Sequence, residues 1–540
     1  MSKGIDDSSD FLLRPVTRRQ ALRGAATLGG VMAFSPIIAA CGGEGASLAS
    51  SPTGVASAAP KKGGSLKIGI VGGSAKDTLD GQVPSSEPSN CFTYQLYDAL
   101  MGYDAEYSLV NLLAESVEAN AAGDVWTVRL RPDVVFHNGK TMTSEDVVYS
   151  YKRILDPKSP GNGQAALNVV LKPSGIRALD ARTVQFSLLS PYAIFEEQLA
   201  YYCNCILPVG FDPKKPIGTG PFKLRKNYPG EQVVFDANKD YWGSGPYVDE
   251  LTVVEFAEPS ARVNALLGGT VHAISQLPRE QIKVVDASGN AKALVAHTGG
   301  MQPFTMAIDM KPFDDVRVRQ AFRLIVDRKQ MLAQAYSDLG WVGNDMYSPL
   351  DPGYPKDLPQ REQDLEQAKS LLKQAGYGGG LVVTLDTSDG VGAGAVAAAS
   401  VFAEQAKGAG VTVKVNKIAD SEYWGENFLH YAFGQTFYYS HQYLAQASLI
   451  TMPTAVWNET HWKNDKWLAI VNEAFRTVDE QKRNELVAEA ETIEHNEGGY
   501  IVWSFNDQVD AYSNDLGGVL PYKNGVPLSG FQFKDFYFAT

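Results

Sequence analysis

Segments with the hydrophobic pattern of strands alternate along the chain with segments that have a helical period. Residues 65–71 and 126–130 have the apolar or alternating pattern of strands. After the second of these, Thr143 and Asp146 form a capping box, and apolar residues then recur at helical spacing up to Leu155. Because such alternation continues through the chain, we expect a mixed α/β fold.

Three further helices have clear beginnings. Asp315, Asp364 and Asp479 each stand at a predicted N-cap, and the helix after Asp364 is expected to end at Gly376. Residues 500–504 then predict a strand. The helices that follow Asp315 carry four arginines, for which we favour a solvated face over a ligand clamp: Arg317, Arg319, Arg323 and Arg328.

Composition limits the possible partners and cofactors. A chain of 540 residues that is 44% hydrophobic can bury large cores and should divide into two or three lobes. A net charge of −13 without any basic run argues against a nucleic-acid partner. The 7 histidines lack metal-ligand spacing, so we predict no metal and no cofactor.

The front of the chain predicts export and a lipid anchor. Residues 17–23, with Arg18 and Arg19, resemble a twin-arginine export signal. The following apolar run is short for a membrane span and contains glycine and proline. It ends in a stretch that resembles a bacterial lipobox, whose Cys41 would carry the lipid. Residues 1–41 are therefore predicted to be a signal peptide.

Residues 42–63 predict a flexible tether. They are mostly Gly, Ala, Ser and Pro and have almost no large apolar side chain, so they cannot bury enough surface to fold. A coil of about 20 residues spans roughly 25 Å. The expected location is extracytoplasmic, anchored to the outer face of the cell membrane.

Three cysteines remain besides the proposed lipid site. In an oxidising compartment Cys91 could pair with Cys203 or Cys205 and leave one thiol free. Alternatively, all three are small buried apolar residues.

Four stretches resemble one family in content and order. They are residues 125–151, 216–243, 313–328 and 364–377. Together they resemble the peptide/nickel class, family 5, of the extracellular solute-binding proteins of ABC transporters. The resemblance covers nearly all of residues 64–540.

This resemblance implies a two-lobed periplasmic-binding-protein-like fold of class II, monomeric, with a hinge and an extra subdomain. Lobe I would comprise residues 64–98, 216–300 and 505–540. The extra subdomain would comprise residues 99–215, and lobe II residues 301–504.

The implied function is capture of a solute by lobe closure and its delivery to ABC permease subunits, without catalysis or catalytic residues. One alternative is a sensor or surface lipoprotein without transport, and another is an exported glycoside-acting or nucleotide-dependent enzyme. Residues 392–394 have the outline of a dinucleotide fingerprint, but three polar residues separate them from the preceding strand. We expect them to form a loop and helix start that line the cleft.

The resemblance also bears on the solute. Dipeptide-binding members hold the ligand amine on an aspartate and its carboxylate on an arginine, whereas this chain has Ser440 and Asp389 at those places. No Asp or Glu occurs between Glu426 and Glu459 to replace the aspartate. We therefore expect an oligopeptide-like solute or another neutral small solute, with an oligosaccharide or an aromatic solute as the alternative.

Candidate ligand contacts follow from an aromatic stretch and from the family's pocket positions. In residues 431–443, Tyr431, Phe433 and Phe437 are expected to face the core, because strand side chains alternate. The residues at the exit of this stretch are expected to face the cleft. The predicted ligand-binding residues are Glu87, Tyr94, Phe304, Asp389, Trp424, Tyr439, Ser440, His441 and Trp503.

Overall fold

The computed structural model describes residues 60–453, 455 and 457–539. The predicted export motif at Arg18 and Arg19, the lipidation site Cys41 and most of the 42–63 tether lie outside these residues. Among the described residues, every helix is too short or too polar to cross a membrane.

The largest sheet joins strands from the beginning, the middle and the end of the described chain. Its strands are β1 (Ser65–Val71), β8 (Phe222–Tyr228), β9 (Gln232–Ala237), β10 (Glu250–Phe256), β11 (Ala273–Ile274), β12 (Ala291–His297), β14 (Gly340–Val342) and β19 (Ser504–Ser513). Their order is β12-β19-β11-β1-β10-β9-β8, and β14 pairs with β19 outside this path. β1 runs parallel to β10 and β11. The first body is therefore discontinuous in sequence.

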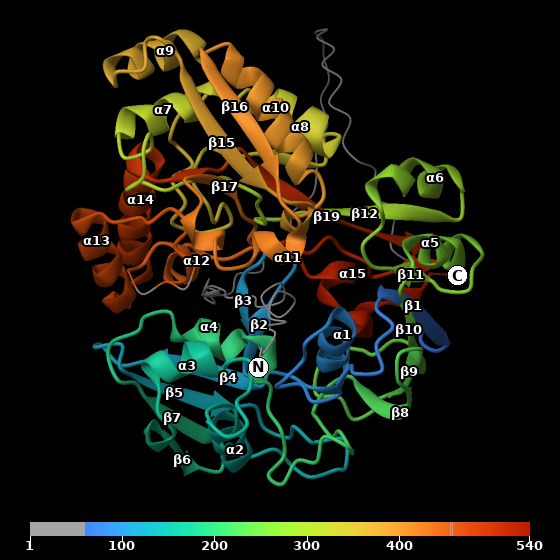
Figure 1. Cartoon of the computed structure of the whole chain (residues 1–540). Coiled ribbons are helices and arrows are strands. Elements are labelled where there is room, and N and C mark those ends of the chain that lie inside the picture. The colour runs from blue at the N-terminus through green and yellow to red at the C-terminus, as the bar shows by residue number, and fades with distance from the viewer. Residues whose placement is uncertain (1–59, 454, 456, 540) are drawn as a thin grey trace, which may run out of the picture.

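We call this sheet, without β14, and the helices around it lobe I; it lies to the right in Figure 1. Its buried core contains residues from three separate segments, for example Ile68, Phe235 and Phe533. The remaining elements of this lobe are α1 (Glu87–Leu96), α5 (Pro259–Leu267), α6 (Ile282–Ala287), β20 (Leu516–Gly517), α15 (Pro527–Gly530) and β21 (Tyr537–Phe538).

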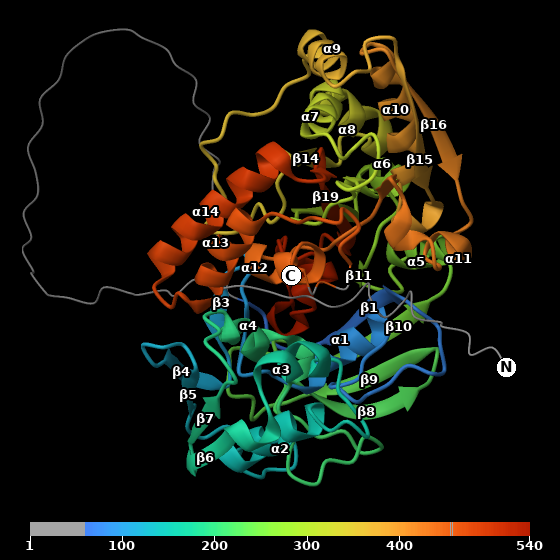
Figure 2. The same cartoon turned by 60° about the vertical axis from the view of Figure 1, so that its left-hand side comes forward.

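A small subdomain lies beside lobe I, at the lower left of Figures 1 and 2, and has its own sheet, with the order β4-β5-β7-β6. Its core is separate and centres on Trp126, Tyr151 and Phe186. Its elements are β2 (Met101–Tyr103), β3 (Leu109–Asn111), β4 (Ala114–Ala119), β5 (Val125–Leu130), α2 (Ser144–Ile154), α3 (Gln164–Val170), β6 (Ile176–Asp180), β7 (Thr183–Ser187) and α4 (Phe195–Ala200).

Lobe II is the upper body in Figure 1 and combines a three-stranded sheet of order β17-β13-β18 with the parallel pair β15-β16. Its strands are β13 (Phe304–Met306), β15 (Leu381–Thr387), β16 (Val411–Lys417), β17 (Phe433–Gln435) and β18 (Tyr500–Ile501). Its helices are α7 (Val316–Ile325), α8 (Arg328–Tyr336), α9 (Leu365–Gln374), α10 (Ala395–Lys407), α11 (Asp420–Tyr423), α12 (Tyr443–Ile450), α13 (Asp465–Arg476) and α14 (Glu480–Glu497). The two-lobed α/β fold expected from the sequence is therefore observed.

Two adjacent segments join the lobes. The chain enters lobe II after β12 and returns to lobe I at β19, and these two strands are paired up to His297 and Asp507. Beyond that pair, the Asn506 amide donates to the Gly300 carbonyl at 2.7 Å, and the Thr298 hydroxyl donates to the Asn506 carbonyl at 2.7 Å. The crossovers are therefore bonded to each other, as a two-segment hinge requires.

The local predictions are mostly confirmed. Asp315, Asp364 and Asp479 each accept a bond from a backbone amide of the helix that they precede. The Thr143 amide donates to the Asp146 carboxylate at 3.0 Å. The predicted continuous strand over residues 500–504 is wrong in part, because β18 ends at Ile501 and β19 begins at Ser504. β14 pairs with residues 504–506 at the start of β19, so the chain leaves lobe II within β19.

The solvated face predicted for the four arginines is wrong for three of them. Arg319, Arg323 and Arg328 are 5%, 0% and 4% exposed, and only Arg317 is exposed to solvent. Arg323 donates to the carbonyls of Glu494, His495, Gly498 and Tyr500.

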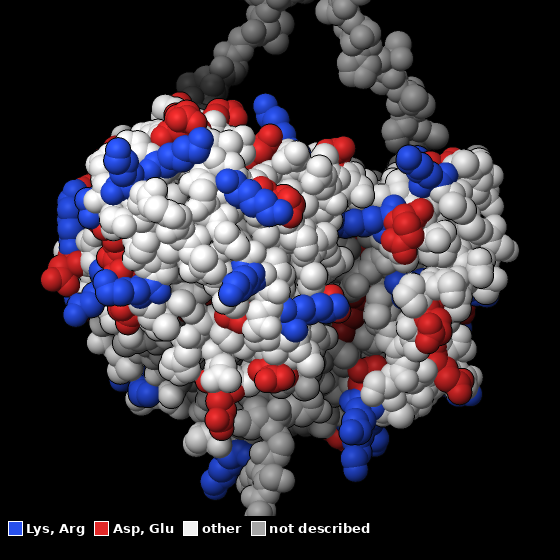
Figure 3. Space-filling model, turned by 45° about the horizontal axis from the view of Figure 1, so that its top comes forward, with Lys and Arg blue, Asp and Glu red and all other residues white. Residues whose placement is uncertain are grey.

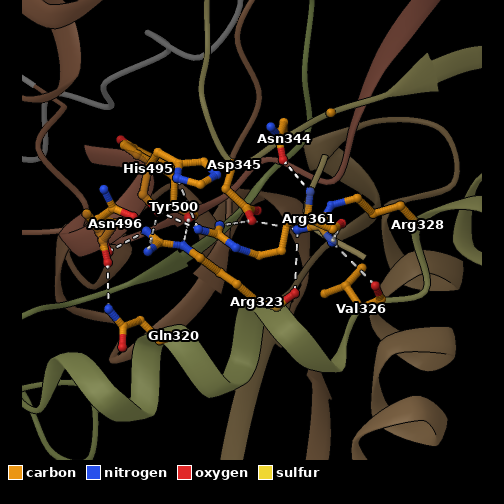
Figure 4. Close-up of polar contacts among 12 residues, drawn as sticks. Gln320, Arg323, Val326, Arg328, Asn344, Asp345, Arg361, His495, Asn496 and Tyr500 are labelled. Carbon is orange, nitrogen blue, oxygen red and sulfur yellow. Dashed lines mark hydrogen bonds and ion pairs between the residues drawn. The ribbon is translucent and has the colours of Figure 1, made fainter. Parts of the chain in front are cut away.

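Figure 4 shows Arg323 above α7. Beside it, Asp345 forms ion pairs with Arg328 and Arg361. The buried positive charges are tolerated because each guanidinium faces carbonyl oxygens or a carboxylate. The hydrophobic pattern of the sequence does not reveal these partners.

Of the two alternatives for the cysteines, the structure has the second. Cys91, Cys203 and Cys205 are all buried, and Cys91 and Cys205 are free thiols. Burial raises the pKa of the Cys91 and Cys205 thiols well above the ordinary value, so both stay protonated.

Candidate ligand-binding cavity

A cavity of about 510 Å³ lies between the lobes and is lined from both sides. Most of its wall belongs to lobe I, whereas Ala393 and Tyr439 come from lobe II. Figure 3 shows the face on which a hollow separates the two lobes. The volume is in the range of small-molecule sites.

Glu87 lies on the lobe I side at the first position of α1. Its carboxylate accepts hydrogen bonds from the Ser275 hydroxyl, the Gln276 side-chain amide and the Val71 backbone amide, the last at 3.3 Å. Burial raises the pKa of Glu87 to about 7, and the charge of Asp510 adds to this effect against the opposing hydrogen bonds. Near neutral pH, Glu87 therefore exists in both protonation states.

Asp510 and Arg262 lie behind this wall. Asp510 accepts from the backbone amides of Gln276 at 2.8 Å and Leu528 at 2.6 Å. Burial raises its pKa to about 6. The Arg262 guanidinium donates to the carbonyls of Ser275 at 2.9 Å and Gln276 at 3.0 Å. These bonds fix the loop whose side chains hold Glu87.

The wall is acidic overall. Its lining includes three carboxylates, Glu87, Glu280 and Asp507, but one guanidinium, Arg279. Asp507 bonds to the exposed His297 at 2.7 Å. Arg279 lies over the ring of Tyr336 at 5.0 Å, and burial lowers its pKa. With all four groups ionised, the lining carries a negative net charge.

Aromatic rings cover much of the remaining wall. Tyr94 stacks on Tyr202 with 5.3 Å between the ring centroids, and Phe531 meets Tyr94 edge-on at 6.0 Å. Tyr439 faces them from lobe II and remains 37% exposed. Burial and then the charge of Glu87 raise the pKa of Tyr439 to about 12, so its hydroxyl stays protonated at neutral pH. The cavity thus offers flat apolar faces beside charged groups.

Three of the predicted ligand-binding residues meet in this cavity: Glu87, Tyr94 and Tyr439. Ala393 joins them from the glycine-containing loop before α10, as expected for residues 392–394. The Gly392 and Gly394 backbones have φ values of 131° and 85°, which L side chains rarely adopt, so glycine lets this loop turn there.

Ser440 and His441 lie beside the cavity lining but are buried at 2% and 5% exposure. The Ser440 hydroxyl accepts from the Gly299 amide at 2.8 Å and donates to the Lys523 carbonyl at 3.1 Å. The Tyr107 hydroxyl donates to the Ser440 carbonyl at 2.8 Å. Ser440 thus connects lobe II to a crossover segment, to lobe I and to the subdomain.

Asp389 and Trp424 lie outside the residues that line the cavity. Asp389 is exposed and forms an ion pair with Lys417 at 2.7 Å. Trp424 packs within an aromatic cluster against Phe428 and Phe437, with ring centroids 4.6 Å and 5.6 Å away.

Phe304 and Trp503 lie in the core of lobe II and are both 0% exposed. The Trp503 indole packs on Tyr336 at 4.9 Å, and its N–H donates to the Gln302 carbonyl at 3.2 Å. Both faces of these segments are covered by packed elements, so large rings here fill the core. The sequence alone does not show whether an aromatic residue at a family pocket position contacts ligand or fills the core.

Several lining residues escaped the sequence analysis. Gln276 and Arg279 come from the turn after β11, Asp507 comes from β19, and Phe531 follows α15. For Asp507 the sequence offered one signal, a charged residue within a strand. β19 carries both Asp507 and Asp510, although the strand is otherwise partly buried. The meeting of these distant segments depends on the sheet order.

Comparisons with known proteins agree with this geometry. The family model of the bacterial extracellular solute-binding proteins, family 5 Middle, matches residues 108–454. Di/tripeptide-binding protein 2 of Pseudomonas aeruginosa (strain UCBPP-PA14) is 30% identical over 369 residues, 62% of this chain and 67% of that protein. Glutathione-binding protein GsiB of Escherichia coli (strain K12) is 24% identical over 486 residues, 86% of this chain and 93% of that protein.

A solved structure shows the same fold. HbpA2 from Haemophilus parasuis superposes with a TM-score of 0.79 at 21% identity and covers 88% of this chain and 100% of its own.

Proposed function

Since the chain belongs to family 5 of the bacterial extracellular solute-binding proteins, we propose that it captures a small solute between its lobes and delivers it to an ABC-type permease. Capture is by lobe closure, and the ligand acts by favouring the closed arrangement. The protein works as a non-catalytic receptor and as a monomer.

The observation that carries this proposal is the cavity with walls from both lobes. Glu87 and Tyr94 contribute from lobe I, and Tyr439 contributes from lobe II. Because two bonded crossover segments join the lobes, a rotation there would bring Tyr439 toward the lobe I wall. A bound solute would be enclosed by that movement.

The proposed solute is oligopeptide-like or another small compound that fits about 510 Å³. The relatives named for di/tripeptides and for glutathione support the first choice. The dipeptide anchors of the family are replaced here by Ser440, which is committed to interlobe bonds, and by Asp389, which pairs with Lys417. The solute is therefore held differently from a dipeptide.

The location and the moving units are part of the same proposal. Export by the twin-arginine motif at Arg18 and Arg19, with lipidation of Cys41, would hold the receptor at the outer face of the cell membrane. Closure would move residues 301–504 against the remainder of the folded chain.

Native mass spectrometry tests this function directly. The full chain is purified from its host cells without refolding, in mild detergent, and examined for co-purified mass. We expect an adduct that is lost in the Ala393→Trp variant, because the indole would occupy the cavity. A ladder of masses that fragments into amino acids identifies peptides, and a single non-peptide adduct identifies another class.

Retention of the same adduct in Ala393→Trp would show that the ligand binds outside this cavity. Turnover of the adduct by the purified protein would favour an enzyme.

A further inference from the structure

We propose that Glu87 is the group that selects the ligand, by pairing with a protonated amine on it, so that the cavity takes amine-bearing compounds and rejects their neutral counterparts. The inference rests on the proposed function, because it assumes that the solute occupies this cavity. It moves charge recognition from lobe II, where Ser440 has replaced the aspartate, to lobe I.

The unbalanced charge of the wall is the first argument. Glu87, Glu280 and Asp507 line the cavity with Arg279 as the cationic lining residue. Lobe closure removes water from these groups, and a buried carboxylate without a counter-charge is costly. A ligand that brings a positive charge restores the balance, whereas a neutral ligand leaves the cost in place.

The bonding of Glu87 is the second argument. Its Oε1 accepts from Ser275 and Val71, while Oε2 accepts from Gln276. A carboxylate offers about four acceptor positions. Among the described residues these three donors leave one position on Oε2, beside the cavity. An ammonium group has three donors and can occupy it.

The rings supply the third argument. Tyr439 lines the wall of the cavity opposite Glu87, and Tyr94 and Phe531 line the same side as the carboxylate. Aromatic faces attract cations, most strongly where water is excluded. An ammonium group between Glu87 and the Tyr439 ring would therefore gain from both.

The charge state of Glu87 gives a readout beyond affinity. The titratable groups near it are Asp510 on β19, Arg262 on α5, Cys91 on α1 and Tyr439 from lobe II. Burial raises the pKa of Glu87 to about 7, and an ammonium partner would lower it. Amine binding should therefore release protons below neutral pH and strengthen as the pH rises from about 5.5 to about 7.5.

The experiment uses two matched pools and the full chain. One pool contains di- to tetrapeptides, aromatic amines and amino sugars, and the other is the same pool after N-acetylation, which removes the positive charge. Binding is detected by native mass spectrometry, and the selected compounds are measured by calorimetry between pH 5.5 and pH 7.5. We expect binding from the free-amine pool alone.

Glu87→Gln is the diagnostic variant, because it keeps the shape and the hydrogen-bonding capacity but removes the charge. We expect amine affinity to fall about ten- to a hundredfold and its pH dependence through neutrality to disappear. The matched control is Glu280→Gln. Glu280 also lines the cavity but is exposed to solvent, so removal of its charge should weaken binding much less. Unchanged thermal melting checks that the fold is retained.

The outcomes separate the two proposals. Binding of acetylated compounds with equal strength, or unchanged affinity in Glu87→Gln, overturns the amine inference and leaves solute capture intact. Binding from neither pool overturns the amine inference, and if no co-purified adduct is found either, solute capture by this cavity fails as well. If Glu87→Gln does not fold, a wild-type affinity that stays flat with pH overturns the inference by itself.

Discussion

At the scale of single residues, an aromatic side chain has a role set by what surrounds it. Tyr439 and Trp503 were both predicted to contact ligand, but Tyr439 lines the cavity while Trp503 is fully enclosed by lobe II. Truncation should therefore affect ligand binding in one case and folding in the other.

Tyr439→Ala is expected to weaken ligand affinity by about 1–3 kcal/mol, because the ring is lost from the cavity wall. Stability should change little, since the side chain is 37% exposed. Calorimetry with the co-purified ligand measures the affinity, and an unchanged value would remove Tyr439 from the site.

Trp503→Ala is expected to lower the free energy of unfolding by about 3–5 kcal/mol, because it leaves a cavity beside Tyr336. Urea denaturation measures this loss. The affinity of the folded fraction should remain close to that of the wild type. A stable variant with weakened binding would instead place Trp503 in contact with ligand.

At the scale of elements, buried charges join separate helices. Near the end of α14 the Glu494 carbonyl accepts from the Gly498 amide at 2.8 Å and the His495 carbonyl from Arg361 at 2.9 Å, and Arg323 of α7 donates to both carbonyls. Burial lowers the pKa of Arg323 to about 9, so the guanidinium stays charged at neutral pH and also complements the helix dipole.

Arg323→Gln should lower the free energy of unfolding by about 3–5 kcal/mol, since four buried carbonyls each lose one charged donor. Arg317→Gln, on the exposed side of the same helix, should stay within about 0.5 kcal/mol of the wild type. Chemical denaturation of both variants checks the contrast, and equal effects would contradict the capping role.

Helix α14 also carries a buried acid, Glu494, that makes the stability of the protein depend on pH. Glu494 accepts from the hydroxyls of Tyr347 at 3.0 Å and Tyr443 at 2.6 Å. Burial raises its pKa from 4.5 to about 7. As pH rises above about 4.5, the unfolded carboxyl ionises first, so the folded state loses stability until about pH 7.

Glu494→Gln should therefore match the wild type near pH 4 and exceed its stability by up to about 3 kcal/mol at pH 8. The control is Glu489→Gln, at an exposed position of α14, which should show no such trend. Urea denaturation across this pH range measures the difference, and parallel curves for all three proteins would contradict the assignment.

At the scale of the whole molecule, three bodies meet at one buried residue. The Ser440 hydroxyl connects the Gly299 crossover and the Lys523 segment of lobe I, and its backbone carbonyl binds Tyr107 of the subdomain. One small residue therefore links all the parts that closure would move.

Ser440→Ala should increase amide hydrogen exchange around residues 298–300 and 522–525, because the Gly299 amide loses its acceptor and the Lys523 carbonyl its donor. Ser448→Ala removes a hydroxyl that bonds within α12 and should change exchange only in that helix. Identical exchange in Ser440→Ala and the wild type would show that this link does not hold the lobes.

The amount that could be predicted differs between these scales. Asp315, Asp364 and Asp479 were recognised because a cap and its amide donors are neighbours in sequence. Arg319 and Arg323 were missed because most of their carbonyl partners lie more than a hundred residues away, and Arg328 because its partners Asp345 and Arg361 lie outside its own helix. For the cavity, Glu87 and Tyr94 were predicted from family positions and Tyr439 from its place at the exit of an aromatic stretch. Arg279 had no local signal, and Asp507 had only that of a charge within a strand.

The sequence by itself determined the local elements and the two-lobed family, because each depends on residues close together in the chain. The tertiary structure alone decided which aromatic residues face ligand and which fill the core. It also decided that an acidic wall forms from α1, the turn after β11 and β19. These segments become neighbours only through the sheet order, and burial then sets the charge balance that they present to a solute.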